Sequence, residues 1–166
     1  MSAVLCESRR AAGRICAATM IASLFSGAIA RADDVPSYCA QLRQVAAAAL
    51  TKDKFAGIVG KPRTGNFLDA TVALPGWEDC AFYGLRTYTC DSHGFKTAEE
   101  GDRALATILG EVKACLRDGW AEDQSRASPE YVVLHDTRQV ASITINTDRS
   151  DHGEPIVRLI LFLRSR

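Results

Sequence analysis

Several catalytic signatures are missing from this sequence. It has no Gly-x-Ser-x-Gly elbow of a serine hydrolase, no His-Glu-x-x-His pair of a zinc peptidase, and no Gly-Lys-Ser/Thr ending of a phosphate-binding loop. It also has no Cys-x-x-Cys pair, and its cysteines are widely scattered, which argues against a zinc site. No motif therefore assigns a reaction, and we expect neither a metal nor a cofactor.

The sequence also lacks an apolar run long enough to span a bilayer. The one candidate, at 15–30, has 16 residues, whereas a membrane-spanning helix needs roughly 20, and Ser and Gly interrupt it. Arg9, Arg10 and Arg14 precede this run, which is the layout of a secretory signal peptide. We therefore expect residues 1–32 to be a cleaved signal peptide, with an uncleaved anchor as the alternative.

Two cleavage sites are possible at the end of that run. Small residues occur in Ala-Ile-Ala at 28–30 and in Ala-Arg-Ala at 30–32, so cleavage is expected just after Ala30 or just after Ala32, and we prefer the second. With 32 of the 166 residues removed, 134 remain, which suits one domain at 33–166. We expect a bacterial protein that is periplasmic or secreted after cleavage and that does not then span the membrane.

Clustered positive charge is absent from the expected mature chain. Residues 1–32 hold four of the 20 basic residues and one of the 20 acidic residues, so 16 basic and 19 acidic residues remain, a formal charge of −3. Binding to phosphate groups is driven by clustered Lys and Arg, which release counterions. The charge therefore argues against nucleic acid or anionic lipid as a partner.

Four cysteines remain in the mature chain: Cys39, Cys80, Cys90 and Cys115. An even number in an oxidising compartment predicts two disulfides, although four cysteines allow three pairings and the sequence alone does not choose among them. We prefer Cys80 with Cys90, because a hairpin with its loop at 84–86 places these residues directly opposite each other. Cys39 and Cys115 would then join two helices.

Two helices are expected. The first opens at 34–36, where Asp34 can cap it and proline is tolerated, and glycines from Gly57 onward stop it. The second begins at a capping box, in which Thr97 accepts from the third helical amide and Glu100 reaches back to the amide of Thr97. It ends at Gly119.

Strand patterns occupy the rest of the chain. Twofold alternation predicts a strand at 67–74, and a hairpin carries Cys80 and Cys90, while the segment at 60–66 is expected to be an exposed loop. Three more strands are expected in the C-terminal part, at 131–135, 139–147 and 156–163. This order predicts an α+β fold with two helices on one face of an antiparallel sheet of about five to six strands.

Histidine is scarce, with three residues in the chain, and each stands within two positions of an aspartate. Two of these pairs lie in turn-like segments, where Asp and His are ordinary surface residues. His135 lies at the end of an expected strand with Asp136 beside it, so it is the histidine to test as a general base. A thiol nucleophile is not expected if all four mature cysteines are paired.

Aromatic residues are the other candidates for a site. Trp77 follows a Pro-Gly turn, where we expect its ring to close the edge of the core, with ligand stacking as the alternative. Tyr88 lies in the expected hairpin nearby. We name Trp77, Tyr88 and His135 as candidate binding residues, and we name no catalytic residue.

The leading functional hypothesis is a non-enzymatic exported domain. It would bind a protein, a peptide or a component of the cell envelope through the sheet face or through the edge near Trp77 and Tyr88. One alternative is a small envelope hydrolase that uses His135 and Asp136, with a further residue supplied by the fold. Another is a chaperone-like secretion accessory that forms a dimer.

Overall fold

The structure is a computed structural model that describes residues 37–126, 128 and 131–164. The chain divides into two units, Met1–Asp33 and Asp34–Arg166, and the fold described here belongs to the second. The expected signal peptide, its cleavage site near Ala32 and the expected helix opening at 34–36 lie outside the described residues.

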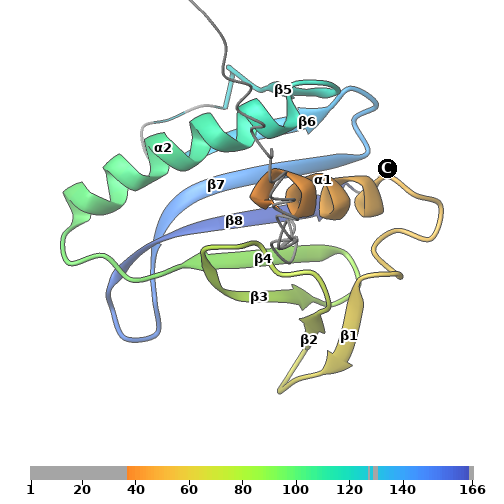
Figure 1. Ribbon diagram of the computed structural model, residues 1–166, viewed down its shortest axis with the longest axis horizontal. Coiled ribbons are helices and arrows are strands. Elements are labelled where there is room, and N and C mark those ends of the chain that lie inside the picture. Colours follow the sequence, from red (N-terminus) through yellow and green to blue (C-terminus); the bar gives the residue numbers. More distant parts are fainter. Residues whose placement is uncertain (1–36, 127, 129–130, 165–166) are drawn as a thin grey trace, which may run out of the picture. The chain divides into compact units, whose positions relative to one another are not determined.

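The described residues form two helices and eight strands (Figure 1). Their order and bounds are α1 (Tyr38–Ala49), β1 (Val59–Pro62), β2 (Phe67–Ala70), β3 (Trp77–Tyr83), β4 (Thr87–Ser92), α2 (Ala98–Leu116), β5 (Trp120–Glu122), β6 (Tyr131–Asp136), β7 (Ala141–Arg149) and β8 (Pro155–Leu163).

All eight strands belong to one antiparallel sheet, in the order β1-β2-β3-β4-β8-β7-β6-β5. The chain therefore repeats one pattern twice: a helix followed by a meander of four strands. The last strand of each half, β4 and β8, meet at the centre of the sheet. Trp77 and Trp120, which stand in similar Gly-Trp contexts, do not occupy matching places in the two halves, because one opens β3 and the other opens β5.

The α+β fold is confirmed, but the expected number of strands is wrong. The two strands that the sequence pattern misses, β1 and β5, are the two edges of the sheet. The loop expected at 60–66 begins as part of β1, whose Gly60 and Pro62 are unfavourable in a strand and are tolerated at an edge. Strand β5 has three residues, too few to show an alternating pattern.

The strand expected at 67–74 is also shorter than predicted. Strand β2 stops at Ala70, so Val72 and Leu74 lie in the connection to β3 instead of in the sheet. Leu74 is still buried, with 1% of its surface exposed. The alternating apolar pattern therefore predicts correctly that Leu74 is buried, but Leu74 lies in a loop that packs on the core and not in a strand.

The helix ends follow local capping chemistry. The Thr97 hydroxyl accepts a hydrogen bond from the amide of Glu100 at 3.2 Å, as expected for the start of α2. The Glu100 carboxylate, however, accepts from the amide of Lys96 at 3.0 Å, one residue before the predicted partner. Helix α2 ends at Leu116 with Arg117 as its C-cap, so the expected end at Gly119 is three residues late. Gly119, with a φ of +101°, instead closes the turn that leads into β5, a conformation that suits glycine.

Both helices pack on one face of the sheet (Figure 1). The buried residues of α1 and α2 form a single cluster with every second residue of the central strands. In β8, for example, Leu159 and Leu161 belong to this cluster, whereas Arg158 and Ile160 point to the opposite face. We call the first surface the helix face and the second the open face.

The two expected disulfides are present. Cys80 and Cys90 are directly opposite each other in the β3–β4 hairpin, with their Cα atoms 4.1 Å apart. Cys39 of α1 is bonded to Cys115 of α2, with a Cα separation of 5.1 Å. Arg43, one turn beyond Cys39, donates a hydrogen bond to the Cys115 carbonyl at 2.7 Å, so the bridge and this bond tie the two helices together.

Candidate functional site: the open face of the sheet

The open face is organised in rows that run across the strands. Directly paired residues in antiparallel strands point to the same side of the sheet, so the register defines each row. The first row is charged and polar, the second is formed by small and branched residues, and the third has aromatic ends. In strand order β3-β4-β8-β7-β6, the rows are Asp79-Asp91-Arg158-Asn146-Tyr131, Ala81-Thr89-Ile160-Thr144-Val133 and Tyr83-Thr87-Phe162-Ser142-His135.

A cleft of about 540 Å³ lies on the open face over β3, β4 and β8. Its volume falls in the range of roughly 300–1,000 Å³ that is usual for ligand sites. Its lining includes the aromatic side chains of Phe67 and Tyr83, and its wall includes residues from the β7–β8 connection, among them Asp151 and Glu154. No helix of the described part of the chain covers this face. The cleft is therefore an open groove on the sheet.

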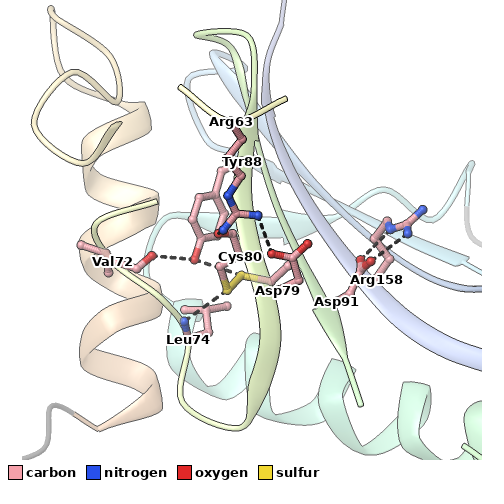
Figure 2. The surroundings of a disulfide bond; sticks show 9 residues. Arg63, Val72, Leu74, Asp79, Cys80, Tyr88, Asp91 and Arg158 are labelled. Carbon is pink, nitrogen blue, oxygen red and sulfur yellow. Dashed lines mark hydrogen bonds and ion pairs between the residues drawn. A yellow bond between two sulfur atoms is a disulfide. The ribbon is translucent and has the colours of Figure 1, made fainter. Parts of the chain in front are cut away.

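Arg158 holds the centre of the charged row. Its guanidinium donates two hydrogen bonds to Asp91, at 2.6 and 2.8 Å, and a third to Asp148. The hydrogen bonds to Asp91 raise the pKa of Arg158 above its ordinary value despite partial burial, and the charges of Asp91, Asp148 and Asp151 add to this rise. Figure 2 shows the pair on the side of β4 away from the Cys80 disulfide and Tyr88. Three strands, β4, β8 and β7, are thus locked across the floor of the groove.

A second set of ion pairs lies beside the groove, where β2 pairs with β3. Arg63 follows β1 and donates to Asp69 at 2.6 Å and to Asp79 at 2.7 Å (Figure 2 shows the Asp79 bond). Hydrogen bonds to these two carboxylates, the one to Asp69 first, raise the pKa of Arg63. Asp79 and Asp91 therefore both have a cation within the molecule.

Three other carboxylates at the groove have no such cation. Glu78, Asp151 and Glu154 line the cleft, are exposed, and make no side-chain hydrogen bond or ion pair within the described residues. Glu154 lies against Gly94, so close that a Cβ at that position would collide with its carboxylate. Asp151 acts on Arg158 through its charge alone. One end of the groove is therefore negatively charged.

The other end of the groove is aromatic. Phe67 and Tyr83 are a cross-strand pair on β2 and β3, with ring centroids 5.4 Å apart in an edge-to-face arrangement. They are 42% and 53% exposed. Exposed aromatic pairs of this kind supply large contact area to a ligand at little cost in conformational freedom.

Tyr88, named above as a candidate binding residue, has no exposed surface and is not available to a ligand. It is fully buried on the helix face, opposite Phe82, and its hydroxyl donates to the Val72 carbonyl at 3.0 Å (Figure 2). Cys90 Sγ lies 3.0 Å from the same oxygen and, as a disulfide sulfur, has no proton to donate. Burial raises the pKa of Tyr88, so the hydroxyl stays neutral. Tyr88 is a core residue.

Trp77 lies on the helix face as well, at the start of β3 and opposite Ser92. It is half-buried against the core and lines a pocket of about 350 Å³ with Tyr38, Phe95 and Ile108. This placement is the one expected for a ring that closes the edge of the core. The pocket is on the other side of the sheet from the open-face groove, so Trp77 and the groove do not form one site.

His135 lies on the open face, but in the other half of the sheet. It is in the same row as Tyr83, four strands away, which is about 19 Å at the usual strand spacing. Its Nδ1 is 2.6 Å from Ser142 Oγ, and its Nε2 is 3.0 Å from Asp123 Oδ2. Hydrogen bonds from Ser125 first, and then His135, lower the pKa of Asp123.

Ser142, His135 and Asp123 are the residue types of a hydrolase catalytic triad, but the serine is not accessible to a substrate. Ser142 has no exposed surface, and it does not line the neighbouring cleft of about 590 Å³ to which His135 and Asp123 contribute. Both ring nitrogens of His135 are occupied by partners within the protein. In this arrangement the serine hydroxyl is not presented to a substrate.

Asp136 does not pair with His135. Adjacent residues of a strand point to opposite faces, and the Asp136 carboxylate, on a residue that is 1% exposed, accepts from three backbone amides of the β6–β7 turn. Those amides belong to Arg138, Val140 and Ala141, at 2.9, 2.6 and 2.7 Å. Asp136 therefore organises a turn, and Asp123 takes the place beside His135 that the sequence suggests for Asp136.

Comparison with protein-family models, with curated proteins and with solved structures gave no match for this chain. Its site is therefore defined by geometry. Within the described residues no group of three or more His, Cys, Asp and Glu side chains is arranged to hold a metal ion, and no helix is both long and apolar enough to cross a membrane.

The residues that line the groove carry few signals in the sequence. Phe67 and Tyr83 come from separate strands, and only the β2–β3 register places their rings together. Arg158 is the exception, because it is the one charged residue within an apolar strand. Such a break in a sequence pattern is typical of a functional site.

Proposed function

We propose that this protein is an exported, non-enzymatic binding domain whose ligand occupies the groove on the open face of the sheet. The observation that carries the proposal is the groove itself: a sheet surface that no described helix covers, with an exposed aromatic pair at one end and, at the other, carboxylates that have no cation among the described residues. Exposed apolar patches rimmed by polar residues are typical of interaction sites. A protein or peptide is the partner class that best fits an open groove.

The export part of the proposal is supported by the two disulfides, since such bonds persist mainly in oxidising compartments. It is tested by the intact mass of protein taken from the exported fraction, denatured and treated with a thiol-blocking reagent without reductant. We expect a mass that starts at Asp33 and no blocked cysteine. A full-length mass, or labelled thiols, would argue against export with cleavage.

The binding part is tested by selecting a random displayed peptide library on the oxidised mature chain. The same selection is made on a Phe67→Ala/Tyr83→Ala variant and on Leu85→Ala. Leu85 is 67% exposed at the tip of the same hairpin but does not line the groove, so its variant controls for the loss of exposed apolar surface. We expect peptides to be enriched on the wild type and on Leu85→Ala, and to be lost on the double variant.

A further inference from the structure

Resting on the binding function proposed above, we infer that the ligand of the groove is an extended basic peptide segment. It carries a Lys or Arg at the acidic end and, about four positions along, an aromatic or large aliphatic side chain at the Phe67–Tyr83 end. The inference concerns the chemistry of the ligand, and its failure is distinguishable from failure of the binding function itself.

Charge complementarity indicates where the basic side chain of the ligand binds. The cleft is lined by five carboxylates, one arginine and one histidine, His152. Arg158 is shared between Asp91 and Asp148, and Arg63 between Asp69 and Asp79, so neither arginine has positive charge to spare for another carboxylate. The uncompensated charge belongs to Glu78, Asp151 and Glu154, which are exposed and lack a cation within the described residues. A ligand cation at this end would take the place of the missing partner, and an anionic ligand would be repelled.

The aromatic pair determines the apolar end. Phe67 and Tyr83 retain about half of their surface in solvent although each ring already packs on the other. An aromatic or aliphatic ligand side chain placed on these rings would cover the exposed part. No carboxylate belongs to the Tyr83-Thr87-Phe162 part of the third row, so the negative charge and the apolar contact are at different places in the groove.

The register gives the distance between the two ends. Asp79, beside Glu78, and Tyr83 are both on β3 and point to the open face, four residues apart, which is about 13 Å in a strand. In an extended peptide, residues four positions apart lie on the same side and are separated by the same length. A single extended segment can therefore reach both ends.

The floor between the ends leaves room for the backbone of an extended peptide. It consists of Ala81, Thr89 and Ile160. Ala81 leaves room for a backbone to approach, and Ile160 gives apolar contact. The Thr89 hydroxyl is buried, with no hydrogen-bond partner among the described residues, so it is not presented to the ligand.

The test uses defined peptides and the oxidised mature chain, with affinity measured by isothermal titration calorimetry. The first peptide is acetyl-Arg-Lys-Ser-Thr-Ser-Phe-amide, in which Lys and Phe are four positions apart. In a neutral version Gln replaces both cations, and in an acidic version Glu replaces them. In a fourth peptide Phe is moved next to Lys, so that the composition is kept and the spacing is lost. We expect the first peptide to bind at least about tenfold more tightly than each of the others.

Protein variants locate the effect. Glu78→Gln/Asp151→Asn/Glu154→Gln removes the unpaired carboxylates, and we expect it to weaken the first peptide roughly tenfold and to flatten the salt dependence of binding. Asp53→Asn/Glu99→Gln/Asp118→Asn makes the same change in net charge at exposed residues outside the groove. We expect this control to bind the peptide like the wild type.

The outcomes separate the two claims. If neutral or acidic peptides bind as tightly as the basic one, and all depend on Phe67 and Tyr83, the basic ligand is wrong and the binding function stands. If both triple variants weaken the peptide equally, the attraction is that of net charge alone and the inference fails. If no peptide of any charge binds, and light scattering shows a mass that rises with concentration, a second copy of the chain covers the groove and both claims fail.

Discussion

Two neighbouring residues of β6 have different roles because they point to opposite faces of the sheet. Asp136 is buried at the end of β6, where it accepts hydrogen bonds from amides of the β6–β7 connection. His135 is on the open face beside Asp123. The sequence correctly marks His135 as a polar residue at a strand end. It could not supply its partners, because Asp123 and Ser142 reach it through a loop and through the β6–β7 register.

Replacing Asp136 tests its assignment as a turn residue. In Asp136→Asn, three backbone amides lose a charged acceptor in a buried position, and we expect the free energy of unfolding to fall by about 2–3 kcal/mol. Urea unfolding followed by circular dichroism measures the loss. Asp53→Asn, at an exposed residue, is the control and should change stability by less than about 0.5 kcal/mol. An equal, small effect in both variants would contradict the assignment.

Tyr88 shows why the sequence could not say which aromatic residues are exposed. Alternation in β4 places Tyr88, Cys90 and Ser92 on one face, but the sequence does not say which face the helices cover. An aromatic residue can lie on either face of a sheet, and the residues that surround it decide whether it is buried or exposed. Here Tyr88 is opposite Phe82 and Leu161 in the core, and the exposed rings in this half of the sheet are Phe67 and Tyr83 instead.

At the scale of elements, hairpins and helices with strong local signals were predictable and edges were not. The β3–β4 hairpin, with its loop at 84–86, follows from its glycine turn and its pair of cysteines. Helix α2 follows from its cap and its apolar stripe. Strands β1 and β5 pair on one side only and are short, so tertiary pairing rather than local pattern makes them strands.

The two disulfides constrain different lengths of chain, and their removal should reflect this. Cys80–Cys90 spans 10 positions and Cys39–Cys115 spans 76. In the chain-entropy description, loss of the short bridge costs about 2–3 kcal/mol and loss of the long one about 4–5 kcal/mol. Guanidinium unfolding of Cys80→Ala/Cys90→Ala and of Cys39→Ala/Cys115→Ala, each compared with the wild type, measures the difference. A larger loss for the hairpin bridge would contradict this account.

At the scale of the whole molecule, the repeated pattern of a helix and four strands leaves the two faces of the sheet with different roles. Both helices and both disulfides stabilise the helix face, and the Arg158 and Arg63 ion pairs hold strands together on the open face. Among the described residues, the open face thus has no covering layer and is held by ion pairs between its strands. A surface of that kind can bind a ligand without first changing shape.

The affinity of the strongest library-selected peptide for the wild type, for Phe67→Ala/Tyr83→Ala and for Leu85→Ala tests the central claim most directly. We predict that the double variant binds roughly 30-fold more weakly than the wild type, as for loss of an aromatic hot spot, and that Leu85→Ala binds within about twofold of it. Equal affinity for all three proteins would show that the ligand does not occupy the open-face groove.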